Sequence, residues 1–408
     1  MPDISQTAAH RHLPRPTATL PPRAAFFLLA SITASFLAGS SAPTPLYPVY
    51  QAEWGFSATM VTCIFAVYAI ALLAALLVAG RLSDHVGRRP VLIAATLAQA
   101  ATMVLFATAD GLVGLLVARV LQGLSTGAAV AAVGAGMLDI DKTRGAVANA
   151  FAPPLGTATG AILAGLTVHF LPAPTVLVYG VLGVVFVAQA IGVAFMAETV
   201  APRAGAIASM MPQLNVPPRA RNALMLAVPV LLAAWAFGGF YASLGPALVG
   251  RVFGLDASLL GGIALFVLAG SGAASILLMQ HHAPERMMSA GAWALVIGVA
   301  VVLAAISLHS ASMFFAGSVV AGVGLGAGFQ GAVRTVVPHA APHERAGLLS
   351  VIFVVSYLAL SVPAVVAGWL VSHGGSIPAT AREYGFVVIA LALAALVGTI
   401  GRRVPSRA

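Results

Sequence analysis

The chain has 408 residues, of which 60% are hydrophobic and only 8% are charged, and its net charge is +9. A soluble domain carries about 25% charged residues, so this composition excludes a water-soluble globular protein. The single cysteine, Cys63, excludes an internal disulfide framework, and basic residues spread over alternate loops argue against nucleic acid as a partner.

The first 23 residues are polar and rich in proline and arginine, which predicts a disordered cytoplasmic tail. Beyond them, apolar runs of about 20 residues recur, the length that an α-helix needs to cross the bilayer. The runs are continuously apolar, which favours helices over a β-barrel. We therefore expect an all-α membrane protein. Its twelve spans are predicted near residues 24–48, 57–80, 90–109, 112–138, 146–168, 174–197, 222–249, 257–279, 288–308, 311–336, 346–371 and 384–401.

The distribution of basic residues predicts the orientation of the spans. Sixteen of the 20 Lys and Arg residues fall on the side of the two termini. Arg251 and Arg382 fall on the other side, and Arg119 and Arg334 fall within spans. Because cytoplasmic loops are enriched in basic residues, we expect a multi-pass protein of a bacterial inner membrane with both termini in the cytoplasm.

A proline-rich, arginine-rich break near the middle of the chain predicts two halves. Residues 55–57 and 144–146 resemble residues 254–256 and 345–347, an offset of about 200 residues. Repeated membrane halves place a binding site at their interface near the midplane. The expected parts are a six-helix bundle over 24–197, a cytoplasmic linker over 198–221, a second six-helix bundle over 222–401 and a short cytoplasmic tail over 402–408.

The loop between the second and third predicted spans carries Gly80, Asp84, Gly87, Arg88 and Arg89. The glycines permit a tight turn, the aspartate suits a helix N-terminus, and an arginine can bridge to a carboxylate. This segment resembles the signature loop of the major facilitator superfamily, G-x-x-x-D-x-x-G-R-[KR]. The resemblance implies two pseudo-symmetric bundles of six helices, with a loop that is remade as access alternates, and an ordinary basic loop is the alternative.

The fourth span carries Arg119, Gln122 and Gly123, which resemble the R-x-x-Q-G motif of the same family. An arginine within a span costs several kcal/mol unless it is paired or lines water. We therefore expect Arg119 to face a wet central cavity, with Gln122 on the same helix face, and to bind solute or influence coupling. The alternative is a structural arginine that is bonded to backbone carbonyls.

Glycines at four-residue spacing, Gly123 with Gly127 and Gly156 with Gly160, predict close helix packing. The second pair lies in a stretch that resembles the glycine-rich fifth-helix motif of drug–proton antiporters. That motif has Gly-Pro and later Gly-Gly, whereas here Gly156 and Gly160 are followed by threonine and alanine. Export is the function that the motif implies, and simple helix packing is the alternative.

The tenth span is expected to be the pseudo-repeat of the fourth, with Gln330 and Arg334 on one face. The family's cytoplasmic charge network is expected to combine the signature loop with Asp139, Asp141 and Arg334. Aromatic and polar side chains in the second half are expected to line the cavity. The predicted substrate or coupling residues of that half are Trp235, Tyr241, Gln330 and Tyr357.

The eleven carboxylates all fall in loops, tails or helix ends, so a proton-carrying acid at mid-depth is missing. We predict a proton-coupled exporter of small organic molecules, such as drugs or hydrophobic metabolites. The resemblance implies a monomer, and no enzyme activity, cofactor, metal or nucleic-acid partner is expected. The alternatives are an uptake porter or facilitator for a neutral or anionic nutrient, and a membrane sensor that does not transport.

Overall fold

The computed structural model describes residues 19–401, so most of the predicted first tail and all of residues 402–408 lie outside the described residues. Within them, twelve helical segments are long and apolar enough to span a membrane, which confirms the predicted all-α architecture. The spans are α1 (Pro22–Ser41) with α2 (Pro43–Trp54), α3 (Ala58–Ala79), α5 (Arg88–Ala107), α6 (Leu112–Ile140), α7 (Lys142–Phe170), α8 (Pro174–Ala194), α10 (Pro218–Phe253), α11 (Ala257–Leu278), α12 (Pro284–Leu308), α13 (Ala311–Val336) with the 3-10 turn η1 (Val337–His339), α14 (Arg345–Ser372) and α15 (Ile377–Gly401).

The first span is longer than predicted, because the helix runs on through a proline-rich stretch to Trp54. Ala42 keeps a helical conformation and bonds back to Ala38, and Pro43 takes the first helical position, where a missing N–H costs nothing. The seventh span begins at Pro218 for the same reason, one turn before the predicted residue 222.

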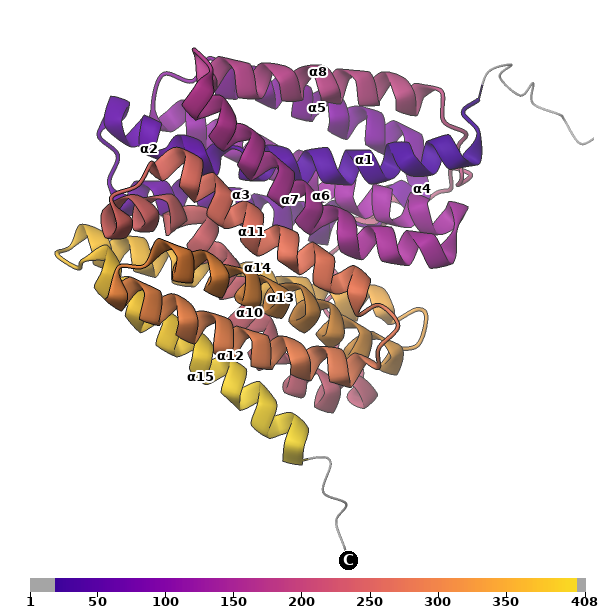
Figure 1. Cartoon of the computed structure of the whole chain (residues 1–408). Helices are drawn as coiled ribbons and strands as arrows, with labels where there is room; N and C mark the ends of the chain where they lie inside the picture. The colour runs from indigo at the N-terminus through magenta and orange to yellow at the C-terminus, as the bar shows by residue number, and fades with distance from the viewer. Residues whose placement is uncertain (1–18, 402–408) are drawn as a thin grey trace, which may run out of the picture.

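The helices form two layers, with the first six spans above the last six in Figure 1. Each layer has its own hydrophobic core, one formed by residues 25–196 and the other almost wholly by residues 220–396. In Figure 1, α1 begins at the upper right and α15 runs from the left to the lower centre; we call the side on which the chain begins and ends the terminal face. The opposite side, which carries residues 55–57 and 254–256, is called the distal face.

Glycines let the helices of each bundle approach closely. A Cβ atom at Gly123 or Gly127 of α6 would lie 2.5 Å from a backbone oxygen of α3. Gly156 and Gly160 of α7 press against the backbone of α1 in the same way. The four glycines therefore lie where two backbones touch, and a larger side chain would force the helices apart.

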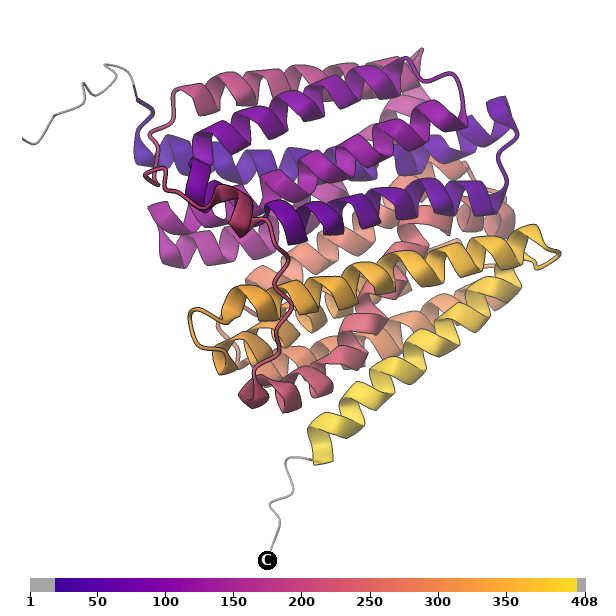
Figure 2. The ribbon, with the colours of Figure 1, turned by 180° about the vertical axis from the view of Figure 1, so that it is seen from behind.

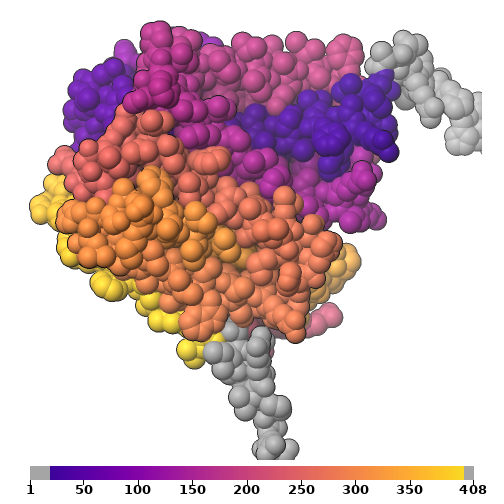
Figure 3. All heavy atoms as spheres, in the orientation of Figure 1, coloured from indigo at the N-terminus to yellow at the C-terminus, as the bar shows by residue number. Residues whose placement is uncertain are grey.

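Most of the contact between the bundles is made by two helix pairs, α7 with α11 and α3 with α14. Gly165 at the distal end of α7 faces Ser258 and Leu259, and Gly368 of α14 faces Thr62 of α3. Space-filling atoms of the two bundles meet directly across the visible face (Figure 3). The bundles are therefore in close contact near the distal face.

The connection between the bundles passes over the terminal face, as Figure 2 shows from behind. Apart from the short helix α9 (Ala206–Ser209), it is irregular. Its first part is fixed to the signature loop, because the N–H of Arg203 donates to the carbonyl of His85 at 2.8 Å. The ring Nδ1 of His85 lies 3.0 Å from the carbonyl oxygen of Ala204.

Candidate functional site

Arg119 lies in the middle of α6 and is completely buried. Its Nη1 donates to the carbonyl of Ser40 at 3.0 Å and to Oε1 of Gln122 at 2.7 Å. Its Nη2 donates to the hydroxyl of Tyr47 at 2.6 Å, and within residues 19–401 its Nε has no hydrogen-bond partner. The guanidinium is thus held by a carbonyl of α1, a phenol of α2 and an amide of its own helix.

Three aromatic rings surround the same guanidinium. Its central carbon lies 5.4 Å from the ring centre of Tyr68, 5.7 Å from that of Phe106 and 5.9 Å from that of Tyr47. Within residues 19–401 no carboxylate forms an ion pair with Arg119. The buried charge is therefore balanced by dipoles and aromatic faces rather than by an opposite charge.

The structure does not place Arg119 in a wet cavity in this conformation. Its bond to the Ser40 carbonyl matches the alternative of a structural arginine. The sequence shows a charge within an apolar run but not how many carbonyls and rings converge on it, and this is why the cavity prediction fails here. A role of Arg119 in solute binding or coupling remains a prediction.

The polar network extends beyond Arg119 into the core of the first bundle. Gln122 donates through Nε2 to the carbonyl of Gly39 at 3.0 Å. One turn further on, Ser125 donates to Oε1 of Gln99, whose Nε2 finds no partner in the described part of the chain. Tyr47 and Gln99 were not predicted, although an uncharged polar residue in an apolar run, such as Gln99, is a usable signal for a buried polar network.

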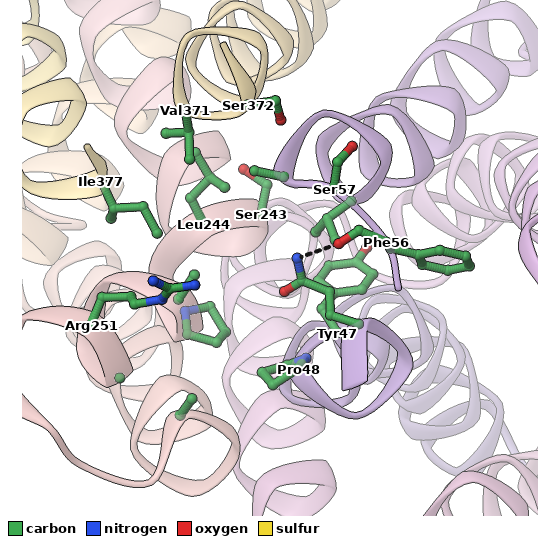
Figure 4. A pocket seen from close by; sticks show the side chains of 17 residues that line it. Tyr47, Pro48, Phe56, Ser57, Ser243, Leu244, Arg251, Val371, Ser372 and Ile377 are labelled. Atoms are coloured by element: carbon green, nitrogen blue, oxygen red, sulfur yellow. Dashed lines mark hydrogen bonds between the residues drawn. The ribbon is translucent and has the colours of Figure 1, made fainter. Parts of the chain in front are cut away.

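A cavity of about 540 Å³ lies between the bundles near the distal face. Figure 4 shows that its wall combines side chains of the first bundle, such as Tyr47 and Ser57, with Leu244, Arg251 and Ser372 of the second. Tyr47 lines this cavity and also binds Arg119 through its hydroxyl. The cavity and the buried guanidinium therefore share the side chain of Tyr47.

The second bundle holds an aromatic cluster at its partly buried inner side. The ring of Trp235 lies edge-on to Tyr357, with centroids 4.9 Å apart, and to Phe329 at 5.3 Å. All three are half-buried, as is Gln330, for which the described part of the chain offers no hydrogen-bond partner. These four residues remain candidates for solute contact.

Tyr241 does not join that cluster. It is buried in the core of the second bundle, where its hydroxyl lies 2.8 Å from Oγ of Ser318 and its ring stacks on Phe314. The prediction that Tyr241 contacts solute is therefore wrong for this conformation. The sequence places Tyr241 in a span but does not show which face of that helix turns toward the other bundle. The packing of the helices decides this.

The signature loop forms a charge cluster within the first bundle. Arg88 pairs through Nη1 with Oδ1 of Asp84 at 2.5 Å and through Nε with Oδ2 of Asp139 at 3.2 Å. Asp141 instead accepts the N–H groups that begin α7, and Arg334 donates to the carbonyl of His282. The structure therefore brings Asp84, Arg88 and Asp139 together, and it does not bring Asp141 or Arg334 into the cluster.

The beginning of α5 is held by an acid that the sequence analysis did not single out. Glu198 accepts the N–H of Arg88 at 2.8 Å and the N–H of Arg89 at 3.0 Å. Gly87 has a φ of +105°, and a Cβ there would lie 2.7 Å from the Glu198 carboxylate. Gly87 is thus required by backbone conformation and by space, whereas Gly80 ends α3 in an ordinary helical conformation.

The sequence profile described as Major Facilitator Superfamily matches residues 29–281. The crystal structure of the human organic anion transporter MFSD10 (TETRAN) is similar with a TM-score of 0.66 and 16% identity, covering 92% of this chain and 100% of that one. The crystal structure of a variant of the nucleoside transporter NupG is similar with a TM-score of 0.67 and 11% identity, covering 93% and 98%. A search of curated protein sequences finds no significant match. The profile covers more than half of the chain and the structures share its fold, so the chain belongs to the major facilitator superfamily and is a membrane transporter rather than an enzyme.

Proposed function

We propose that the chain is a proton-coupled secondary transporter that exports small organic molecules by alternating access. The solutes that fit best carry an anionic or strongly hydrogen-bond-accepting group on a planar, largely apolar body. In this proposal the protein is a monomer in a bacterial inner membrane, and its termini are cytoplasmic, as the basic loops indicate.

The proposed solute class rests on one observation: the guanidinium of Arg119 is buried and has no acidic partner within residues 19–401. A fully buried charge that lacks a counter-ion raises the local positive potential, which disfavours cations and favours anions. Its unpaired Nε is one remaining donor for such a group. The half-buried rings of Trp235, Phe329 and Tyr357 in the other bundle supply a surface for the planar body.

We base export and proton coupling on the signature loop, the Arg119–Gln122 pair and the glycine-rich stretch around Gly156 and Gly160. Of these, the glycine-rich stretch is the one that resembles a motif of drug–proton antiporters. The described spans lack a carboxylate at mid-depth, so the proton carrier must lie elsewhere. Asp139 at the terminal end of α6 and the proton of the solute itself are the candidates that we favour.

Accumulation of a labelled solute library in cells tests direction and coupling together. Export predicts that cells with the protein accumulate less solute than cells without it, and that an uncoupler abolishes the difference. Uptake, the runner-up, predicts more accumulation in cells with the protein. Equal flux of every solute in proteoliposomes with and without the protein would support the non-transporting sensor and contradict our proposal.

A further inference from the structure

A charged contact joins the two bundles at the distal face. Nδ1 of His169, in the last turn of α7, lies 2.8 Å from Oδ2 of Asp256, which precedes α11. We propose that His169 and Asp256 form a latch that holds the distal face closed and that opens when the bundles separate there. This inference rests on the alternating access of the proposed function but not on any particular solute.

Each partner of the latch lies where its charged form is favoured. His169 is at the C-terminal end of α7, and cations are stabilised at that end of a helix. Asp256 caps α11 by accepting the N–H of Ser258 at 2.9 Å and the N–H of Leu259 at 2.8 Å through Oδ1. Oδ2 is therefore available to His169, and the same carboxylate both caps α11 and contacts the other bundle.

The other polar bridges near the same face are uncharged. The hydroxyl of Thr44 donates to the carbonyl of Ala242 at 2.8 Å, and the hydroxyl of Thr59 bonds to Ser372 at 2.9 Å. Of the ion pairs in residues 19–401, the latch is the one that links the two bundles. The described bridges near this face thus comprise one ionic contact beside uncharged hydrogen bonds.

Opening of the distal face must break this contact. The backbones of α7 and α11 touch beside it, where Gly165 faces Ser258 and Leu259 and where Gly262 faces the carbonyl of Ala161. At the terminal face, Arg88 and Arg334 bond within their own bundles. The described ionic contacts thus favour closure of the distal face only.

The carboxylate of the latch is held in its ionised form. Burial alone would raise the pKa of Asp256, but the N–H of Leu259, the His169 side chain and the N–H of Ser258 outweigh it and hold that pKa below its usual value. Asp256 therefore stays ionised to a lower pH than an ordinary aspartate.

No other described group forms an ion pair with either latch residue. The charged or titratable side chains at the distal ends of the surrounding elements are Glu53 on α2, Asp110 before α6, Arg251 on α10 and His309 between α12 and α13. Helices α1 and α8 carry no charge at that end. The described ionic contact at the distal face therefore depends on His169 and Asp256.

The test uses a buried reporter in the purified full-length protein in nanodiscs, where both faces are accessible. In a Cys63→Ser background, Thr62→Cys places a thiol at a fully buried position against Gly368. The rate of maleimide labelling, normalised to the unfolded protein at each pH, then reports opening of the distal face. At pH 6, His169→Asn and Asp256→Asn should each speed labelling by about two- to fivefold, the range expected for a partly exposed ion pair.

Matched controls separate the latch from general effects. Asp141→Asn changes a helix-capping aspartate that has no cross-bundle partner among residues 19–401, and His373→Asn changes an exposed histidine that bonds to its own helix. Both should label like the parent. Equal labelling of the parent, His169→Asn and Asp256→Asn at pH 6 would overturn the proposal.

A second variant does not depend on the reporter. In the Cys63→Ser background without Thr62→Cys, His169→Cys with Asp256→Cys should form a disulfide that stops transport, and a reductant should restore it. Continued transport with the disulfide fully formed would also refute the latch. The labelling experiment needs no solute. If the proposed substrate class is wrong, that experiment still tests the latch, so the two failures can be told apart.

Discussion

The fourth and tenth spans, α6 and α13, show what the two halves share and where they differ. Gly123 and Gly127 of α6 touch the backbone of α3, and Gly322 and Gly326 of α13 touch the backbone of α11 in the same manner. The polar contents differ, because α6 buries Arg119 in a hydrogen-bonded network whereas the inner side of the second bundle presents half-buried aromatic rings. The repeat thus preserves backbone packing, while one half buries a charged side chain and the other presents aromatic rings.

The strongest test of the shared scaffold is Gly123→Val. The added side chain would meet the backbone of α3, so we expect loss of the folded, monodisperse protein, since overpacking alone costs about 1–3 kcal/mol or more. Size-exclusion chromatography in detergent measures the outcome. Gly180→Val is the matched control, because a Cβ at Gly180 of α8 meets no atom within 4 Å. Folding of both variants alike would break the packing argument.

The difference between the halves is tested by Arg119→Met against Arg334→Met. The first leaves Tyr47, Gln122 and the Ser40 carbonyl without their donor, which should lower the free energy of unfolding by about 1–3 kcal/mol. It should also reduce anion flux by about tenfold or more. Thermal unfolding and proteoliposome flux measure these effects. Arg334→Met should reduce flux less than Arg119→Met. Equal effects of the two substitutions would contradict the proposed difference between the halves.

The aromatic half is tested by Trp235→Ala. Loss of the edge-on contacts with Phe329 and Tyr357 should raise the Kd for planar solutes by about two- to tenfold. Isothermal titration with planar and non-planar anions measures the change. Phe315→Ala in α13 is a control outside the aromatic cluster. A larger rise in the Kd for non-planar solutes than for planar ones would contradict the stacking role of Trp235.

The smallest expected effect comes from a test of the signature loop. Asp84→Asn removes one of the two carboxylates of Arg88 while Asp139 remains. Transport should fall by about two- to fivefold with little change in solute affinity, because the pair is partly exposed. Stopped-flow flux and equilibrium binding separate the two quantities. A change in affinity with normal flux would argue against a gating role.

Much of the fold could be predicted from the sequence. The apolar runs specify twelve spans within a few residues, except where prolines at positions 43 and 218 begin helices that the hydropathy pattern does not mark. The spacing of Gly123 with Gly127 and of Gly156 with Gly160 correctly indicates close backbone contact. These features depend on local composition and periodicity, which a sequence displays directly.

The partners of the polar side chains were harder to predict. Of the expected cytoplasmic network, the structure unites Asp139 with Asp84 and Arg88, while Asp141 caps a helix and Arg334 bonds within its own bundle. Glu198 was overlooked as the cap of α5 because it lies 110 residues from Arg88 along the chain. Such contacts depend on the rotation of each helix about its axis.

The sequence by itself determined that this protein lies in a membrane, that it has twelve spanning helices and to which family it belongs, because hydropathy and motif spacing are properties of short segments. Only the tertiary structure decided that Arg119 is buried behind Tyr47, that Tyr241 packs inside its bundle and that His169 meets Asp256 across the bundle interface. Each of these outcomes depends on how two distant helices are placed, and that placement follows from packing over the whole molecule.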